Sequence, residues 1–187
     1  MMLCTVSSAI SIFRIPNGNP PPSISRRPAV LVAVLAAALG ALPSLYAYTV
    51  RSMIHRNLRR LGAGDVGPLL SIYADDVRFV FPGHSSWAAD LWGKDEVERW
   101  VRRFVRVGLQ LEPREILVAG PPWDTTVCLR FIDEATAPDG TVVYSNRGTI
   151  FAKIAWGKVT YYEVNEDTQK VADFDEWLAS HEPTTDA

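Results

Sequence analysis

After residue 50, apolar and polar positions recur with two different periods. A stripe at i, i+3, i+4 follows Gly93, with charged residues covering the opposite face, and this spacing predicts a strong amphipathic helix. The stripe consists of Val97, Trp100, Val101, Phe104 and Val105. Weaker stripes predict helices over residues 51–61, 65–73 and 167–181.

Strand-like segments fill the rest of this region. Residues 77–81 are rich in β-branched and aromatic side chains and end at Pro82-Gly83. Longer runs cover 114–119, 125–135, 141–155 and 158–165, separated by Pro121-Pro122, Pro138-Asp139-Gly140 and Trp156-Gly157. Short turns between consecutive strands predict an antiparallel meander. The order of elements therefore predicts an α+β domain with its helices on one face of an antiparallel sheet.

The first fifty residues have a different pattern. Residues 1–28 end in a run rich in Pro, Gly and Asn, which predicts a disordered tail or reflects an upstream start codon. The 23 residues of 28–50 carry no charge, and a bilayer core of about 30 Å needs about 20 helical residues. We therefore predict a single transmembrane helix over residues 29–50, followed by one domain over residues 51–182.

A cleaved signal peptide is the alternative for this segment. Two arginines precede an apolar stretch, as in such peptides, but leucine stands at the first recognition position of both candidate cleavage sites, Leu39-Gly40-Ala41 and Leu45-Tyr46-Ala47. The denser basic cluster follows the predicted span. This asymmetry favours a single-pass membrane protein with its domain on the cytoplasmic side.

Composition narrows the functional classes. The net charge is -2, and no stripe of basic residues interleaves with aromatic residues, so nucleic-acid binding is not expected. Cys4 and Cys128 form neither a disulfide framework nor a metal-ligand spacing. Phosphate loops, zinc-ligand spacings and nucleophile elbows do not occur in the sequence. We expect no cofactor and no metal.

Four short motifs carry a family resemblance: Ala63-Gly64-Asp65, Tyr73-Ala74-Asp75-Asp76-Val77, Phe81-Pro82-Gly83 and Trp92-Gly93-Lys94-Asp95. Their order and spacing resemble the SnoaL-like and ketosteroid-isomerase-like branch of the nuclear-transport-factor-2-like superfamily, over about residues 51–166. The resemblance implies a cone made by a bent antiparallel sheet and three helices, an apolar pocket inside it, and frequent homodimers formed through the sheet.

The resemblance does not carry a reaction with it. The ketosteroid isomerases have an acidic general base before the Pro that follows the first strand, and Phe81 stands there in this chain. Their oxyanion-binding tyrosine lies on the first helix, at a position that gap-free spacing assigns to Asn57. Ketosteroid-type chemistry is therefore not expected.

Pairing the last strands suggests a polar cluster. If Ala137 pairs with Thr141 and Ala155 with Lys158, one sheet face around Gly148 carries four polar residues, which are Arg130, Asn146, Glu163 and Asn165, and also Tyr161. This cluster could orient a polar ligand group, with Glu163 as a base. The alternative is a structural ion pair on the outer face. A one-residue slip would move a whole strand's side chains to the other face.

A second candidate lies in the loop after residues 77–81. His84 could act there as an acid or base near the pocket mouth, or it is an ordinary surface residue. Trp87 in the same loop is a candidate ligand contact. We expect a domain that binds a small hydrophobic molecule or a partner in an apolar pocket. The alternatives are a cofactor-free isomerase, cyclase or hydrolase using Glu163 or His84, and an interaction module that dimerises without a ligand.

Overall fold

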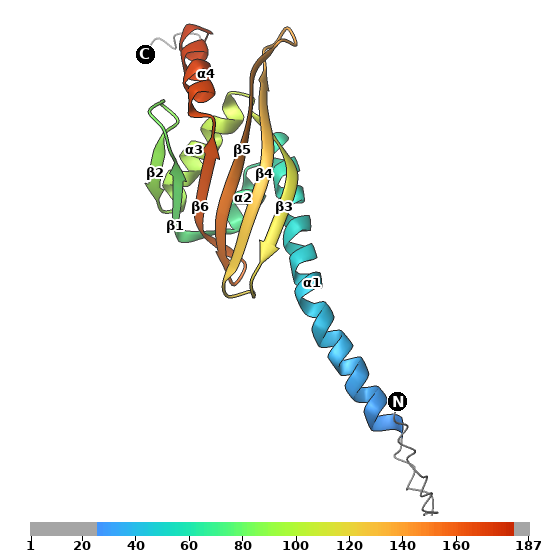
Figure 1. The fold of residues 1–187 in the computed structure, drawn as a ribbon. Helices are drawn as coiled ribbons and strands as arrows, with labels where there is room; N and C mark the ends of the chain where they lie inside the picture. The colour runs from blue at the N-terminus through green and yellow to red at the C-terminus, as the bar shows by residue number, and fades with distance from the viewer. Residues whose placement is uncertain (1–25, 182–187) are drawn as a thin grey trace, which may run out of the picture. The chain divides into compact units, whose positions relative to one another are not determined.

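Six strands form one sheet in the order β2-β1-β6-β5-β4-β3 (Figure 1). The computed structural model describes residues 26–181, and of residues 26–41 it describes only the helical backbone. The strands are β1 (Tyr73–Phe81), β2 (Ala89–Trp92), β3 (Gln110–Ala119), β4 (Thr125–Thr136), β5 (Val142–Ala155) and β6 (Lys158–Glu166). The four long strands that the sequence predicts are confirmed, and the short β2 was not predicted.

The sheet is mixed, which corrects the prediction of an antiparallel sheet. β1 runs parallel to β6, and every other neighbouring pair is antiparallel. Hydrophobic periodicity identifies strands but carries no information about which distant strands pair, so this pairing was not visible in the sequence. β3 is an edge strand and contains Pro113, a residue that sheets tolerate at edges and bulges because it cannot donate a ladder hydrogen bond.

Four helices accompany the sheet: α1 (Arg26–Gly62), α2 (Gly67–Ser71), α3 (Lys94–Arg106) and α4 (Thr168–His181). Gly93 and Gly108 flank α3 with φ values of 89° and 76°, a region that favours glycine. Acidic residues in its first turn and basic residues in its last complement the helix dipole. Val97, Val101 and Phe104 are buried, so the predicted stripe faces the core.

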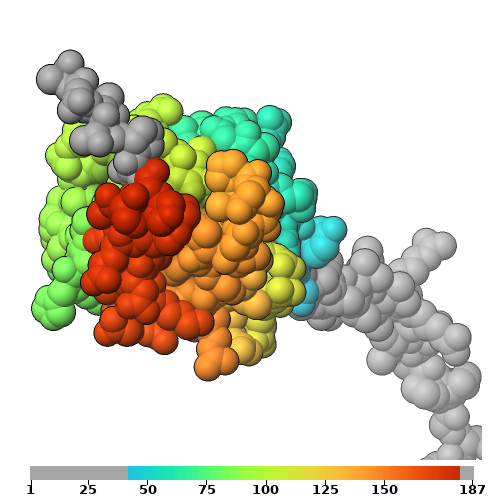
Figure 2. All heavy atoms as spheres, turned by 90° about the horizontal axis from the view of Figure 1, so that it is seen from above, coloured from blue at the N-terminus to red at the C-terminus, as the bar shows by residue number. Residues whose placement is uncertain are grey.

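α4 lies apart from the other helices, at one end of the sheet. Figure 1 shows α2, α3 and the C-terminal part of α1 along one face, while α4 follows β6 at the end of the sheet. In Figure 2, viewed from that end, α4 (red) lies against the β4–β5 region (orange), in agreement with its contacts to β5. Phe174 of α4 stacks on Tyr144 with ring centroids 4.6 Å apart, and both rings are buried. The interior is therefore bounded by the sheet, the three helices and α4.

The chain divides into two units, residues 1–39 and 40–187. In the described part of the chain no helix is both long and apolar enough to cross a membrane. The tail predicted over residues 1–28 lies almost entirely outside the described residues, and most side chains of the span predicted over residues 29–50 are also outside them. Tyr46 and Val50 are described: Val50 is buried, and the Tyr46 hydroxyl lies 2.6 Å from Thr125 Oγ1. The last turn of the predicted span thus contacts the domain.

Candidate functional site

An apolar cavity lies between α1, α2 and the inner face of the sheet. Its volume is about 60 Å³. Aliphatic side chains form most of its wall, among them Met53, Leu58, Leu69, Leu129, Ile150 and Ile154. Tyr73 and Tyr162 also line it, and burial raises the pKa of both phenols above the ordinary value, so both hydroxyls stay protonated. A lining of this kind suits an apolar molecule.

Asn57 is the main polar group in the wall of the apolar cavity. This α1 residue is only 2% exposed, and its Nδ2 has no hydrogen-bond partner among the described residues. A buried amide that lacks a partner costs about 1–3 kcal/mol. Asn57 stands where the family resemblance expects an oxyanion-binding tyrosine, so the position keeps a hydrogen-bond donor although its residue type differs.

The interior continues from this cavity toward α4. A neighbouring cavity of about 40 Å³ shares Leu58, Tyr73 and Tyr162 with the first and is also lined by Glu166. A third, of about 20 Å³, lies between Glu166, Asp133 and aromatic rings. Those rings belong to Phe81, Trp87, Trp100, Phe104, Tyr144 and Phe174. The three cavities therefore form a series that begins at Asn57 and ends at two carboxyl groups.

A hydrogen-bonded network surrounds one of these carboxyls. The Tyr144 hydroxyl donates to Glu166 Oε2 at 2.7 Å, and Asn146 Nδ2 lies 3.1 Å from the same oxygen. Asn146 Nδ2 also donates to the Asp167 carbonyl at 3.0 Å. Asp133, beside Glu166, is 2% exposed, and its Oδ1 has no partner among the described residues. We call Asp133 and Glu166 the carboxyl pair.

Burial is the main reason why the pKa values of both members of the carboxyl pair are raised. Burial, followed by the nearby charge of Glu166, raises the pKa of Asp133 to about 8. Burial also raises the pKa of Glu166, although hydrogen bonds from Tyr144 and Asn146 oppose this effect. The raised pKa values mean that the pair retains a proton near neutral pH. One carboxyl can then donate a proton while the other accepts one.

Two β-bulges decide which predicted residues face this interior. Both predicted hairpin ends are confirmed, since Ala137 N donates to the Thr141 carbonyl at 2.8 Å and Ala155 pairs with Lys158. The register then shifts between Ala135 and Thr136, and again between Lys153 and Ile154. Each shift adds one residue and reverses the faces beyond it.

The predicted cluster is consequently divided between the two faces. The first shift leaves Val143 of β5 without a partner on β4, and the second leaves Thr160 of β6 without a partner on β5. As a result Asn146 pairs with Asp133 and lies inside, while Arg130, Glu163 and Asn165 remain together on the outer face. The prediction that all four share one face is therefore wrong for Asn146, because a bulge cannot be read from turn spacing.

The outer residues have partners other than those predicted. Arg130 pairs with Glu115 at 3.4 Å, and not with Glu163. Glu163 accepts hydrogen bonds from Tyr161 at 2.6 Å and Asn165 at 2.9 Å, which lower its pKa below the ordinary value. An ionised carboxylate in these surroundings is a weak candidate for a general base.

Gly148 lies beside Arg130 and Asn165, as predicted, but the structure leaves no room for a side chain there. A Cβ atom there would lie 2.6 Å from Phe131 Cζ and 2.7 Å from the Asn165 carbonyl oxygen. The position of a Cβ atom is therefore filled by neighbouring atoms, but Gly148 still lines an open groove of about 560 Å³ on the sheet surface together with Arg130 and Asn165.

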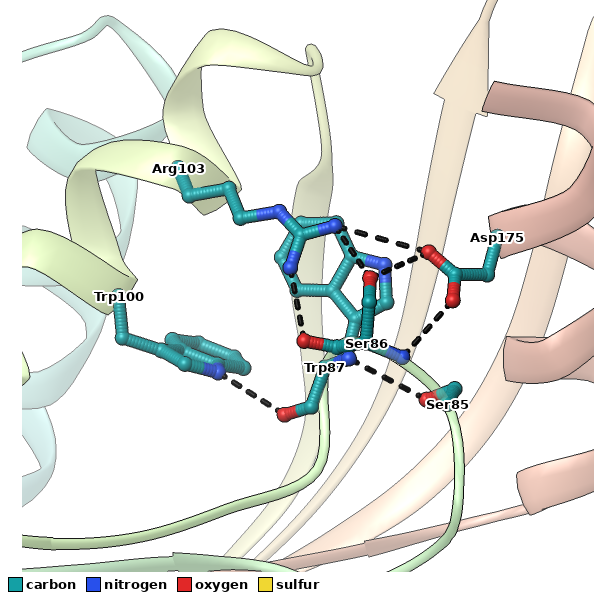
Figure 3. A network of polar contacts seen from close by, with 6 residues as sticks. All are labelled: Ser85, Ser86, Trp87, Trp100, Arg103 and Asp175. Atoms are coloured by element: carbon teal, nitrogen blue, oxygen red, sulfur yellow. Dashed lines mark hydrogen bonds and ion pairs between the residues drawn. The ribbon is translucent and has the colours of Figure 1, made fainter. Parts of the chain in front are cut away.

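The two remaining candidates, His84 and Trp87, lie in the loop after β1 and differ in burial. Figure 3 shows Trp87 and its neighbours. Trp87 is buried and lines the third cavity, whereas His84 is exposed. Asp175 of α4 accepts from Ser86 N at 2.8 Å, and Arg103 of α3 donates to the Ser86 carbonyl at 2.8 Å. The Arg103 guanidinium lies 4.0 Å from the centre of the Trp87 ring. These contacts join loop, α3 and α4 around Trp87.

Sequence reasoning missed the carboxyl pair. Asp133 follows Val127, Leu129 and Phe131 in the same alternating phase of β4, and all four are buried. This period-two signal placed a carboxyl on an apolar face and was sufficient to single it out. Glu166 follows Tyr162 and Val164 in the same alternating phase of β6, so the same signal placed it on the inner face. Among the described residues no group of three or more His, Cys, Asp or Glu side chains is arranged to hold a metal ion.

Comparisons with known proteins agree on the kind of domain. A family model described as the SnoaL-like domain matches residues 54–162. An NTF2-like protein from Burkholderia pseudomallei has 18% identity and a TM-score of 0.55, covering 65% of this chain and 92% of its own. TerC, co-crystallised with polyporic acid, has 22% identity and a TM-score of 0.56, covering 67% and 96%. Bal32a, from a soil-derived mobile gene cassette, has 17% identity and a TM-score of 0.54, covering 70% and 96%. No curated protein matches the chain.

Proposed function

The chain belongs to the SnoaL-like domain family, and on that basis we propose that it binds a small, mostly apolar molecule in the apolar cavity. The observation that carries this proposal is the unpaired Nδ2 of buried Asn57 in the cavity wall. A ligand with one oxygen acceptor would satisfy that donor while its apolar body contacts the aliphatic wall. Binding would thus recover part of the cost of burying the amide.

The size of the cavity limits the ligand. Pockets for drug-sized molecules enclose about 300–1,000 Å³, whereas this cavity has about 60 Å³. A cavity that binds benzene has about 150 Å³, so a ligand with a six-membered ring must displace wall side chains here. Met53, which is half-buried, has an unbranched and adaptable side chain suited to such a movement. TerC, a protein of the same fold, has been co-crystallised with polyporic acid, which supports a small organic ligand for this fold.

A matched pair of probes tests the role of Asn57. Cyclohexanone and methylenecyclohexane have nearly the same shape, and only the ketone accepts a hydrogen bond. We expect thermal-shift titrations to show the ketone binding about 5- to 10-fold more tightly to the wild type, as one hydrogen bond of about 1 kcal/mol gives. In Asn57→Leu this preference should disappear, while the ligand-free protein melts higher because an unpaired buried amide has been removed.

Asn165→Leu is the matched control, since Asn165 lies on the outer face. It should retain the preference of the wild type. If neither probe stabilises the wild type, or if Asn57→Leu retains the preference, the apolar cavity is not the binding site proposed here.

An acid–base enzyme is the second candidate function, favoured by the carboxyl pair. Asp133 has an unpaired oxygen beside the third cavity, and the pair retains a proton near neutral pH. Its ionised member could remove a proton from carbon beside a carbonyl group, and its protonated member could deliver one to the carbonyl oxygen. This chemistry suits an isomerase or cyclase that uses no cofactor. The carboxyl pair replaces Glu163 and His84 as the candidate catalytic groups.

Deuterium exchange tests this second function. In D₂O, the wild type should catalyse exchange of the protons beside the cyclohexanone carbonyl, measured by NMR. Asp133→Asn should lower the rate by about 100-fold or more, the range for loss of a general acid or base. Glu163→Gln should leave it unchanged. A wild-type rate equal to that of buffer would rule out this chemistry for simple ketones and leave the binding function as the better account.

We also propose that residues 29–50 anchor the domain to a membrane on its cytoplasmic side. Support comes from the absence of charge in residues 28–50 and from the basic cluster that follows. Because Tyr46 contacts Thr125, the stretch left for the bilayer is residues 28–45, which at 1.5 Å per residue extends about 27 Å. That length is close to the thickness of a bilayer core.

A further inference from the structure

The β3–β4 and β5–β6 turns lie at the end of the sheet opposite α4 (Figure 1), and each turn carries an exposed tryptophan. Trp123 lies in the turn between β3 and β4, and Trp156 lies in the turn between β5 and β6. They are 58% and 75% exposed, and their ring centroids are 5.8 Å apart. We call them the tryptophan pair. Large apolar side chains exposed together are more informative than single ones, because burying them elsewhere is favourable.

The backbone conformation fixes the positions of the two turns, but it does not require a tryptophan in either of them. Trp156 N donates to the Pro122 carbonyl at 2.7 Å, which joins the two turns. Trp156 has a φ of 52° and Gly157 a φ of 80°. Two-residue hairpin turns with positive φ at both positions favour Asn or Asp followed by Gly. An aromatic residue at the first position is therefore neither favoured by the turn nor buried by the fold, so its ring is available to a partner.

Helix α1 meets the domain beside the same two turns. The Tyr46 hydroxyl lies 2.6 Å from Thr125 Oγ1, and Thr125 Oγ1 donates to the Pro121 carbonyl at 2.7 Å. Leu45 and Tyr48, on either side of Tyr46, are exposed. Apolar surface on α1 thus lies close to the tryptophan pair, at the point where the uncharged stretch of residues 28–50 joins the domain.

Charges around the pair suit a lipid surface. Asp124, next to Trp123, is neutralised by Lys153, with Nζ 2.6 Å from its Oδ1. Lys158, two residues after Trp156, donates from its ammonium group to the Ser71 carbonyl, which holds that group near the turn. Anionic lipid headgroups attract lysines in such positions. Indole rings prefer the membrane interface, where an apolar face and a polar N–H are both accommodated.

We propose that the tryptophan pair rests in the headgroup region of a lipid bilayer and holds this end of the domain against the membrane. The inference rests on the proposed anchoring by residues 29–50. In this arrangement the anchor determines that the protein is at the membrane, and the two rings determine which side of the domain faces the lipid. α4 then lies at the end of the sheet that faces away from the bilayer.

Fluorescence quenching tests the contact with the full chain. The protein is reconstituted into phosphatidylcholine and phosphatidylglycerol vesicles whose lipids carry bromine close to the headgroup. Two of the six tryptophans belong to the pair, so quenching should remove up to about a third of the emission if interface placement is correct. The double variant Trp123→Ser with Trp156→Ser should lose most of this quenching. Trp92→Ser is the control, because Trp92 is 64% exposed but lies on β2.

Each result decides between the proposals. Partitioning into vesicles with quenching that the double substitution abolishes and Trp92→Ser preserves supports the contact. Partitioning with quenching unchanged in the double variant overturns it and leaves the anchor intact. A chain that stays out of the vesicles overturns both the anchor and the contact. A wild type that forms dimers which the double variant does not, without lipid quenching, would assign the pair to a second copy of the chain instead.

Discussion

Replacing Asp133 by asparagine should make the protein more resistant to unfolding at high pH. In the folded protein the pKa of Asp133 is raised from 3.8 to about 8, chiefly by burial. Between these values the folded state holds a proton that the unfolded state has released, so the free energy of unfolding falls as pH rises. The stability associated with this proton is fully present below about pH 4 and is lost as pH rises through about 8. Asparagine has no proton to lose.

The size of the effect follows from the same two values. Each pH unit of difference is worth about 1.4 kcal/mol, and Asp133 and Glu166 titrate together, so the carboxyl pair lowers the free energy of unfolding by several kcal/mol between pH 4 and pH 8. Single domains are stable by about 5–15 kcal/mol in total. Asp133→Asn should therefore be several kcal/mol more stable than the wild type at pH 8, and within about 1 kcal/mol of it at pH 4, because asparagine keeps the shape of the side chain.

Urea unfolding at a series of pH values, followed by near-ultraviolet circular dichroism, measures this difference. Subtracting the variant from the wild type removes titrations that both share. Glu163→Gln is the matched control: its carboxylate lies on the outer face with a lowered pKa, so its pH profile between 5 and 8 should follow the wild type. If Asp133→Asn and the wild type show parallel profiles from pH 5 to 8, Asp133 does not hold its proton in the folded state, and the acid–base site loses its basis.

Three further outcomes follow from packing and composition. Trp100→Ala should lower the free energy of unfolding by about 3–5 kcal/mol, the range for removing a packed aromatic, because its ring contacts four other aromatic rings. In the same urea unfolding experiment Arg102→Ala should change it by less than about 0.5 kcal/mol. Gly148→Ala should lower the free energy of unfolding by about 1–3 kcal/mol, since the new Cβ has no space, and an unchanged melting curve would contradict the contacts described for it. If residues 29–50 anchor the chain, it should stay with membranes after a carbonate wash; a soluble protein that begins near Tyr48 would refute the anchor.

The sequence was sufficient for the local elements. The apolar stripe around Trp100 predicts α3, and Val97, Val101 and Phe104 of that stripe are buried as expected. Helical and strand periodicities depend on side-chain direction along a single segment, so they can be read without knowing any partner. The hairpin ends at Ala137 and Ala155 were also predictable, because turn residues are chosen by backbone conformation.

Tertiary packing decided which side chains meet. The parallel pairing of β1 with β6 joins segments about eighty residues apart, and the two bulges, one on β5 and one on β6, move Asn146 from the predicted outer cluster to the carboxyl pair. A bulge forms where packing on both sheet faces is better with one extra residue than without it, and this balance depends on the neighbouring strands and helices. The sequence by itself therefore determined the family, the order of all elements except the short β2, and the alternating positions of β4, including Asp133. Only the tertiary structure brought Asp133 beside Glu166, because that contact depends on strand register, which local periodicity does not set.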